Sequence, residues 1–157
     1  MDFVFRIMDI PLWYYAAAAA MAIVLFLFKR KWSLCLLTPY LFLVVAITLL
    51  VRSPADSRQT ILQPFWSYTQ WDKQKEQVIT NILMFIPIGF LAGNHWSWKA
   101  IPIAAGFSAI IELTQYLTKR GYCEFDDVFH NSLGAFFGLL IYLGVSWLYK
   151  SVRSSER

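Results

Sequence analysis

The residues best suited to chemistry are a small set of polar side chains that interrupt long apolar segments. Glutamate and aspartate can exchange protons, arginine can hold a phosphate group through two parallel hydrogen bonds, and asparagine and glutamine can orient a ligand. The set comprises Arg52, Asn81, Glu112, Gln115, Arg120, Asp126, Asp127 and Asn131. We interpret these residues as the lining of one ligand-binding pocket.

Helical spacing supports a shared pocket. Four polar residues are separated by steps of four, three and four, which puts them on one face of a helix. They are Ser108, Glu112, Gln115 and Lys119. A carboxylate inside an apolar segment must be paired, hydrated or protonated, because a bare charge is costly there. We therefore expect Glu112 to pair with Arg52 or Arg120.

Small residues indicate where the helices pack. Gly134 and Gly138 follow Asp127 and Asn131 on one helical face, and glycine lets a neighbouring backbone approach closely. A similar stripe of residues begins at Asn81. The predicted packing residues are Phe85, Pro87, Gly89, Gly134 and Gly138. Each helix thus carries a polar tip above a packing surface.

These residues belong to a chain with the composition of a membrane protein. Apolar residues make up 58% and charged residues 15% of its 157 residues, against about 45–50% and about 25% in soluble domains. A water-soluble unit of this size cannot bury so much apolar surface, so the composition excludes a soluble enzyme, a nucleic-acid-binding module and a disordered linker. The net charge of +4 fits loops that face anionic lipid.

Five apolar segments predict membrane-spanning helices, which together form an all-α polytopic bundle in one domain over residues 1–157. The segments cover residues 12–28, 34–51, 78–93, 100–117 and 128–149. At 1.5 Å per residue, their lengths approach the hydrocarbon thickness of about 30 Å. Consecutive spans alternate in direction, so the ends of the second and fourth and the starts of the third and fifth share one membrane face. The unexpected polar residues all gather at that face.

The dense basic cluster of Lys29, Arg30 and Lys31 favours an orientation with the N-terminus outside and the C-terminus in the cytoplasm. In this orientation the polar face of the bundle is the outer one. Cys35 and Cys123 then lie at opposite faces, farther apart than a disulfide can bridge. We therefore expect no disulfide within the chain.

The longest loop, from Arg52 to Gln77, is rich in aromatic residues. Its middle carries Phe65, Trp66, Tyr68 and Trp71. Such side chains either anchor a chain in the headgroup layer or form a lid over a bound ligand. Both interpretations remain open from the sequence.

Two further interpretations of the polar residues must be weighed. Glu112, Asp126, Asp127 and His130 are of the types that bind divalent cations, but their spacing matches no metal motif, so we expect neither a metal nor another cofactor. Polar side chains also serve simply to hold helices together by hydrogen bonds. That structural role is the plainest alternative to a binding site.

The same residues carry a family resemblance. In order along the chain they are Arg52, Asn81-Ile-Leu-Met-Phe85-Ile-Pro87-Ile-Gly89-Phe90, Glu112-Leu-Thr-Gln115, Arg120, Asp126-Asp127-Val-Phe-His-Asn131 and Gly134. In this order, over residues 52–138, they resemble the VanZ family of small polytopic bacterial membrane proteins. The resemblance implies the bacterial cytoplasmic (inner) membrane and an outward pocket near lipid-linked wall precursors. It also implies an antibiotic-resistance role, because the founding member lowers susceptibility to teicoplanin-type lipoglycopeptides.

Three functions follow from these observations. The leading one is a non-enzymatic cell-envelope protein that binds a membrane lipid or lipid-linked cell-wall precursor through Arg52 and Arg120, with no nucleic-acid partner. The second is a small membrane enzyme that uses Glu112 as acid or base, assisted by Asp126 or Asp127. The third is a transporter, with a homodimer packed through the glycines of the last helix as one arrangement. The absence of a detectable inverted repeat counts against transport.

Overall fold

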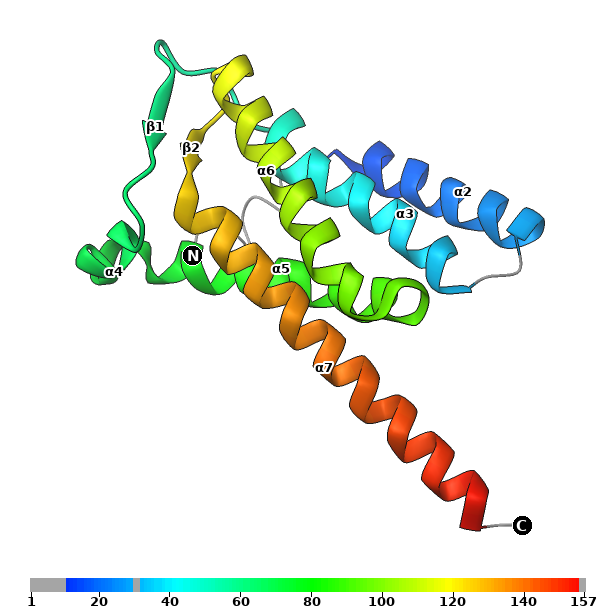
Figure 1. Ribbon diagram of the computed structural model, residues 1–157. Helices are drawn as coiled ribbons and strands as arrows, with labels where there is room; N and C mark the ends of the chain where they lie inside the picture. The colour runs from blue at the N-terminus through cyan, green and yellow to red at the C-terminus, as the bar shows by residue number, and fades with distance from the viewer. Residues whose placement is uncertain (1–10, 30–31, 156–157) are drawn as a thin grey trace.

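The fold comes from a computed structural model that describes residues 11–29 and 32–155. Arg30 and Lys31, which supported the predicted orientation, lie outside the described residues. Helices dominate the fold, which confirms the predicted all-α class. The long helices are α2 (Leu12–Lys29), α3 (Trp32–Val45) with its π-helical continuation η1 (Ala46–Leu50), α5 (Trp71–Trp96), α6 (Ala100–Thr118) and α7 (Phe125–Ser155). Figure 1 shows α2 beside α3, and α7 extending beyond the other helices toward its C-terminal end.

Three stretches of the described chain are long and apolar enough to cross a membrane. They are Trp32–Leu50, Trp71–Thr118 and Phe125–Ser155, and the apolar helix Leu12–Ile23 is shorter. The second stretch contains both α5 and α6, because the short 3-10 helix η2 (Ser97–Lys99) turns the chain between them. Ser97 allows this turn with a positive φ of 49°. The stretches support a membrane protein, and five crossings remain a prediction.

The core lies between α3, α5, α6 and α7. Its buried side chains include Val44, Phe85, Ile111 and Ala135, one from each of these helices. Phe85 is fully buried, whereas Pro87 is half-buried and α5 continues through it. The core therefore fixes the four helices whose polar ends were predicted to meet.

Helices α5 and α7 make the closest contact in the bundle, and glycines permit it. A Cβ added at Gly89 would overlap the carbonyl oxygen of Ala135. A Cβ added at Gly134 or Gly138 would overlap a backbone carbonyl of α5 in the same way. Gly134 and Gly138 thus pack against α5 of the same chain, and a homodimer stays a prediction.

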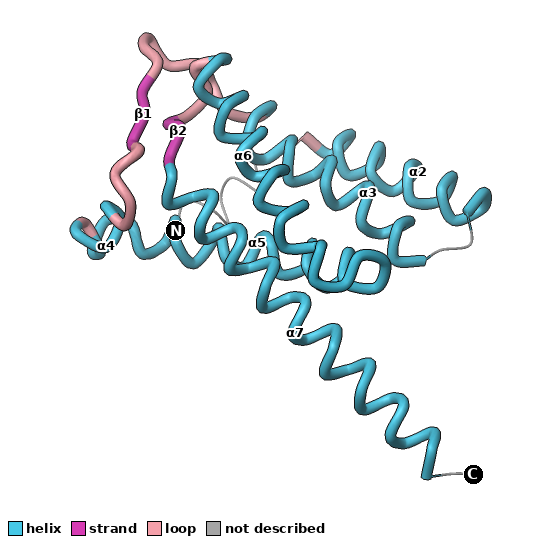
Figure 2. The backbone as a smooth tube through the Cα atoms, viewed as in Figure 1, coloured by secondary structure: helices cyan, strands magenta, loops and turns pink. Residues whose placement is uncertain are grey.

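The connections at the polar end are more ordered than a simple loop. Strands β1 (Gln59–Ile61) and β2 (Tyr122–Glu124) form a two-stranded parallel sheet, and a short helix, α4 (Trp66–Thr69), follows β1 (Figure 2). Helix α5 begins at Trp71, so the predicted loop over residues 52–77 ends earlier than expected. The apolar run begins only at Val78, and the first turns of α5 are polar. Hydropathy therefore predicts the start of the apolar surface at Val78, but it does not predict that α5 begins at Trp71.

Candidate functional site

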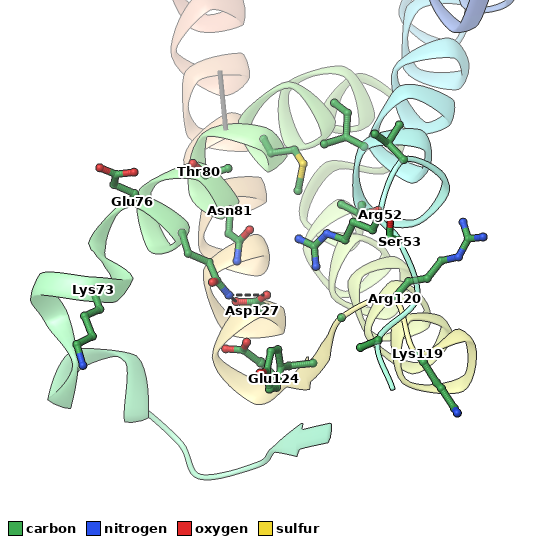
Figure 3. Close-up of a pocket in the computed structure, with 18 residues that line it drawn as sticks. Arg52, Ser53, Lys73, Glu76, Thr80, Asn81, Lys119, Arg120, Glu124 and Asp127 are labelled. Carbon is green, nitrogen blue, oxygen red and sulfur yellow. Dashed lines mark hydrogen bonds between the residues drawn. The ribbon is translucent and has the colours of Figure 1, made fainter. Parts of the chain in front are cut away.

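A cavity of about 600 Å³ opens at the polar end of the bundle. Residues 47–55 form one wall, α5 residues 73–84 form the opposite wall, and residues 119–127 close the cavity from below (Figure 3). The helix ends that were predicted to share one membrane face thus meet around one space. Of the predicted pocket residues, those that line it are Arg52, Asn81, Arg120 and Asp127.

Arg52 is the cation that points into the cavity. It follows the π-helical turn η1, where the amide of Val51 donates to the carbonyl of Ala46 over 3.0 Å. Figure 3 shows its guanidinium directed toward Asn81 and Asp127. Single π-turns are frequent at functional sites, because the wider turn redirects the side chains that follow it.

Gly121 provides the space that Arg52 occupies. A Cβ at this position would lie 2.8 Å from Arg52 Nη1 and 2.9 Å from Gln115 Oε1. Gln115 does not line the cavity, and its Nε2 donates to the carbonyl of Thr48 over 3.3 Å. The absence of a side chain at Gly121 therefore leaves room for the Arg52 guanidinium and the Gln115 amide.

Arg120 lines the cavity but its guanidinium is used elsewhere. Its Nη1 donates to the carbonyls of Leu49 and Leu50, at 2.9 and 3.1 Å, and so caps the end of η1. In Figure 3 the guanidinium points away from Asn81 and Asp127. The predicted two-arginine clamp is therefore not formed, since Arg52 alone of this pair faces the space.

The opposite wall is acidic and polar. Gln77 Nε2 donates to both carboxylate oxygens of Asp127, at 3.1 and 3.2 Å. The half-buried Asp127 thereby stays fixed at the cavity surface, at the start of α7. The side chain of Asn81, one turn further along α5 than Gln77, points toward this carboxylate.

Glu112 lies behind the cavity. The side chain is 3% exposed, and its Oε2 accepts a hydrogen bond of 2.9 Å from the amide of Glu124. Of its two predicted partners, Arg52 interacts with it electrostatically, whereas Arg120 donates to backbone carbonyls. Glu112 does not line the cavity, whereas Glu124 and Asp127 do.

Glu124 is the carboxylate that the sequence interpretation missed. It lies in β2, is 7% exposed and lines the cavity beside Asp127. Burial, and next the negative charge of Asp127, raise the pKa of Glu124 to about 7. Glu124 lies between two apolar segments, where a charged residue is ordinary, so the sequence pattern does not indicate a role for it.

Asp126 has a different role from its neighbour Asp127. It is fully buried, and its Oδ1 accepts from the amide of Phe65 over 2.6 Å. Its Oδ2 accepts from the amide and hydroxyl of Ser67, at 2.9 and 2.6 Å. These bonds fasten α4 to the start of α7, so Asp126 supports the architecture around the cavity and does not line it.

The aromatic loop is attached to the same helix. The hydroxyl of Tyr68 lies 3.0 Å from His130 Nε2, and the rings of Phe65 and Phe129 meet edge to face. Exposed aromatic surface remains on Phe65, Tyr68 and Trp71. This arrangement is compatible with both a membrane anchor and a lid.

Asn131 is a contact between helices. Its Nδ2 donates to the hydroxyl of Ser108 over 2.7 Å, and both residues are buried. It therefore fits the structural alternative and lies outside the cavity lining. Cys35 and Cys123 are both free thiols. Within residues 11–29 and 32–155 no group of three or more His, Cys, Asp or Glu side chains is arranged to hold a metal ion.

Comparison with known proteins identifies the family. No curated protein and no solved structure matches the chain. The sequence model of the VanZ/LLP1 family matches residues 12–149. This match covers most of the chain, including the whole cavity lining. The chain therefore belongs to the VanZ/LLP1 family.

Proposed function

We propose that the protein is a non-enzymatic component of the bacterial envelope that binds a phosphate-bearing lipid, or a lipid-linked cell-wall precursor, in this cavity. The observation that carries the proposal is the Arg52 guanidinium directed into a space of about 600 Å³ at the end of an apolar helix bundle. A guanidinium offers paired donors that match phosphate oxygens. In the proposed membrane location, this end of the apolar helices lies at the level of the lipid headgroups.

The proposed location is the cytoplasmic membrane, with the cavity and the N-terminus on the outer side. A lipid bound there would lie where lipoglycopeptides meet their membrane-anchored targets. Reduced susceptibility to teicoplanin-type antibiotics is the proposed consequence, and VanZ/LLP1 membership supports it.

Binding of a fluorescent phospholipid to the purified protein tests this function. Arg52→Gln should weaken binding about ten- to a hundredfold, because it removes charge-assisted hydrogen bonds worth about 1.5–3 kcal/mol. The matched control is Arg58→Gln, which changes an exposed arginine outside the cavity lining. Equal binding by wild type and Arg52→Gln would contradict the proposal.

A second experiment measures teicoplanin susceptibility in a sensitive Gram-positive host that expresses the same variants at equal membrane levels. We expect protection by wild type and Arg58→Gln and its loss in Arg52→Gln. Protection that persists in Arg52→Gln would separate the phenotype from the cavity.

A membrane enzyme is the second candidate, and one observation favours it. Glu124 and Asp127 face the cavity together, and a carboxyl group with a pKa near 7 can act as acid or base at neutral pH. In this alternative the acid or base is Glu124 or Asp127, because these two carboxylates line the cavity and Glu112 does not. A chemical change in extracted lipids that disappears in Glu124→Gln would support the enzyme over the binding protein.

A further inference from the structure

The cavity has one cationic wall and one acidic wall. Arg52 enters from the end of η1, and Asp127 and Glu124 lie across from it (Figure 3). Of the other cations in the lining, Arg120 donates to backbone carbonyls and Lys119 Nζ donates to the carbonyl of Asp56 over 3.2 Å, while Lys73 belongs to α5. The two walls therefore present opposite charges to one ligand.

Asn81 marks where the ligand lies between these walls. Its side chain is 8% exposed and belongs to the cavity lining. Its Nδ2 faces Asp127 and stabilises that carboxylate, but within the described residues it meets no acceptor in good hydrogen-bond geometry. Buried amide donors are normally satisfied, so this donor indicates an acceptor supplied by a ligand.

Resting on the proposed function, we infer that the bound headgroup is zwitterionic, a phosphate ester that carries a primary ammonium group. Its phosphate oxygens accept from Arg52 and Asn81, and its ammonium donates to Asp127 and Glu124. Gln77 occupies only part of the hydrogen-bonding capacity of Asp127, since a carboxylate accepts at about four lone-pair positions. The remaining positions suit an ammonium group with three donors.

Other common headgroups fit these walls less well. A purely anionic headgroup, such as phosphoglycerol, brings negative charge to Arg52 but supplies no cation to the two carboxylates. A quaternary ammonium, such as choline, balances the charge but has no N–H to donate. We therefore expect the cavity to bind an ethanolamine headgroup more tightly than a choline or glycerol headgroup.

Titration calorimetry on the full-length, detergent-purified protein measures this order. The probes are three phospholipids with identical short acyl chains and ethanolamine, choline or glycerol headgroups, together with soluble phosphoethanolamine. We expect ethanolamine lipid to bind at least about tenfold more tightly than glycerol lipid, as for a buried charge-assisted contact. Asp127→Asn should weaken ethanolamine binding and strengthen glycerol binding, because it removes attraction for one and repulsion for the other.

Glu124→Gln provides a second test should Asp127→Asn fail to fold, and Arg58→Gln is again the matched control. If wild type binds glycerol lipid as tightly as ethanolamine lipid and neither acidic variant changes that ratio, the zwitterionic ligand is wrong while phosphate binding stands. If no phospholipid binds, or if Arg52→Gln changes none of the affinities, the proposed function itself fails. Equal binding of soluble phosphoethanolamine and its lipid would support the zwitterion and identify a soluble source.

Discussion

At the scale of single residues, Glu124 is the group whose ionisation can be followed in the physiological pH range. Its pKa is about 7 in the folded protein against an ordinary value of 4.5, because burial and Asp127 disfavour its charge. The folded state therefore binds the proton more tightly than the unfolded state does. This stabilising contribution is complete below about pH 4.5 and is lost as the pH rises to about 7.

Glu124→Gln should remove this dependence, since glutamine does not titrate. The melting temperature of the detergent-solubilised variant should fall less than that of wild type between pH 5 and pH 8. Glu76→Gln, which changes an exposed glutamate at the cavity rim, serves as control. A variant that retains the full wild-type difference would show that another group titrates in this range.

The sequence identified those site residues that interrupt apolar segments. Arg52, Asn81 and Asp127 stood out because a polar side chain in an apolar run needs an explanation. Glu124 and Gly121 did not, because they lie between segments, where polar residues and glycine are ordinary. Their importance depends on contacts with residues far away in the chain, which no local pattern reveals.

At the scale of elements, the α5–α7 contact determines how the acidic wall is placed. Gly138→Ala should destabilise the protein, because the added Cβ overlaps the carbonyl of Ile86 and the helices must separate. Overpacking of this kind costs about 1–3 kcal/mol. Gly144→Ala is the matched control in the same helix, since a Cβ there meets no atom within 4 Å.

Thermal unfolding in detergent measures the difference between these two variants. We expect a lower melting temperature for Gly138→Ala and an unchanged or slightly higher one for Gly144→Ala, because alanine favours the helix by up to about 1 kcal/mol. Equal stability of both variants would mean that the close approach of α5 and α7 is not required.

The long helices followed from hydropathy, but the smaller elements did not. Helix α4 depends on three hydrogen bonds to Asp126, and β1 depends on its pairing with β2. Both contacts join segments far apart in sequence, so neither element has a strong local signature. Asp126 was predicted to line the pocket, but it binds α4. Its hydrogen-bond partners lie far away in the sequence, so no local pattern indicates this role.

At the scale of the whole molecule, the membrane orientation decides which compartment the cavity faces. Tyr122 lines the cavity, Trp98 lies in η2 at the far end of α5 from Trp71, and both are exposed. In a variant lacking Cys35 and Cys123, Tyr122→Cys should react in intact cells with a membrane-impermeant maleimide, whereas Trp98→Cys should not. The reverse pattern would place the cavity in the cytoplasm and contradict the proposed envelope role.

Strands β1 and β2 are synthesised at different times, so their pairing must wait for the later strand. Chains are made from the N-terminus, so β1 and Arg52 emerge long before β2 and α7. Until then β1 has no strand to pair with, Gly89 has no opposing helix, and the cavity has no Asp127. A chain interrupted before Tyr122 would contain Arg52, Lys119 and Arg120 but neither Glu124 nor Asp127. Synthesis of the last helix is thus the step that completes the cavity.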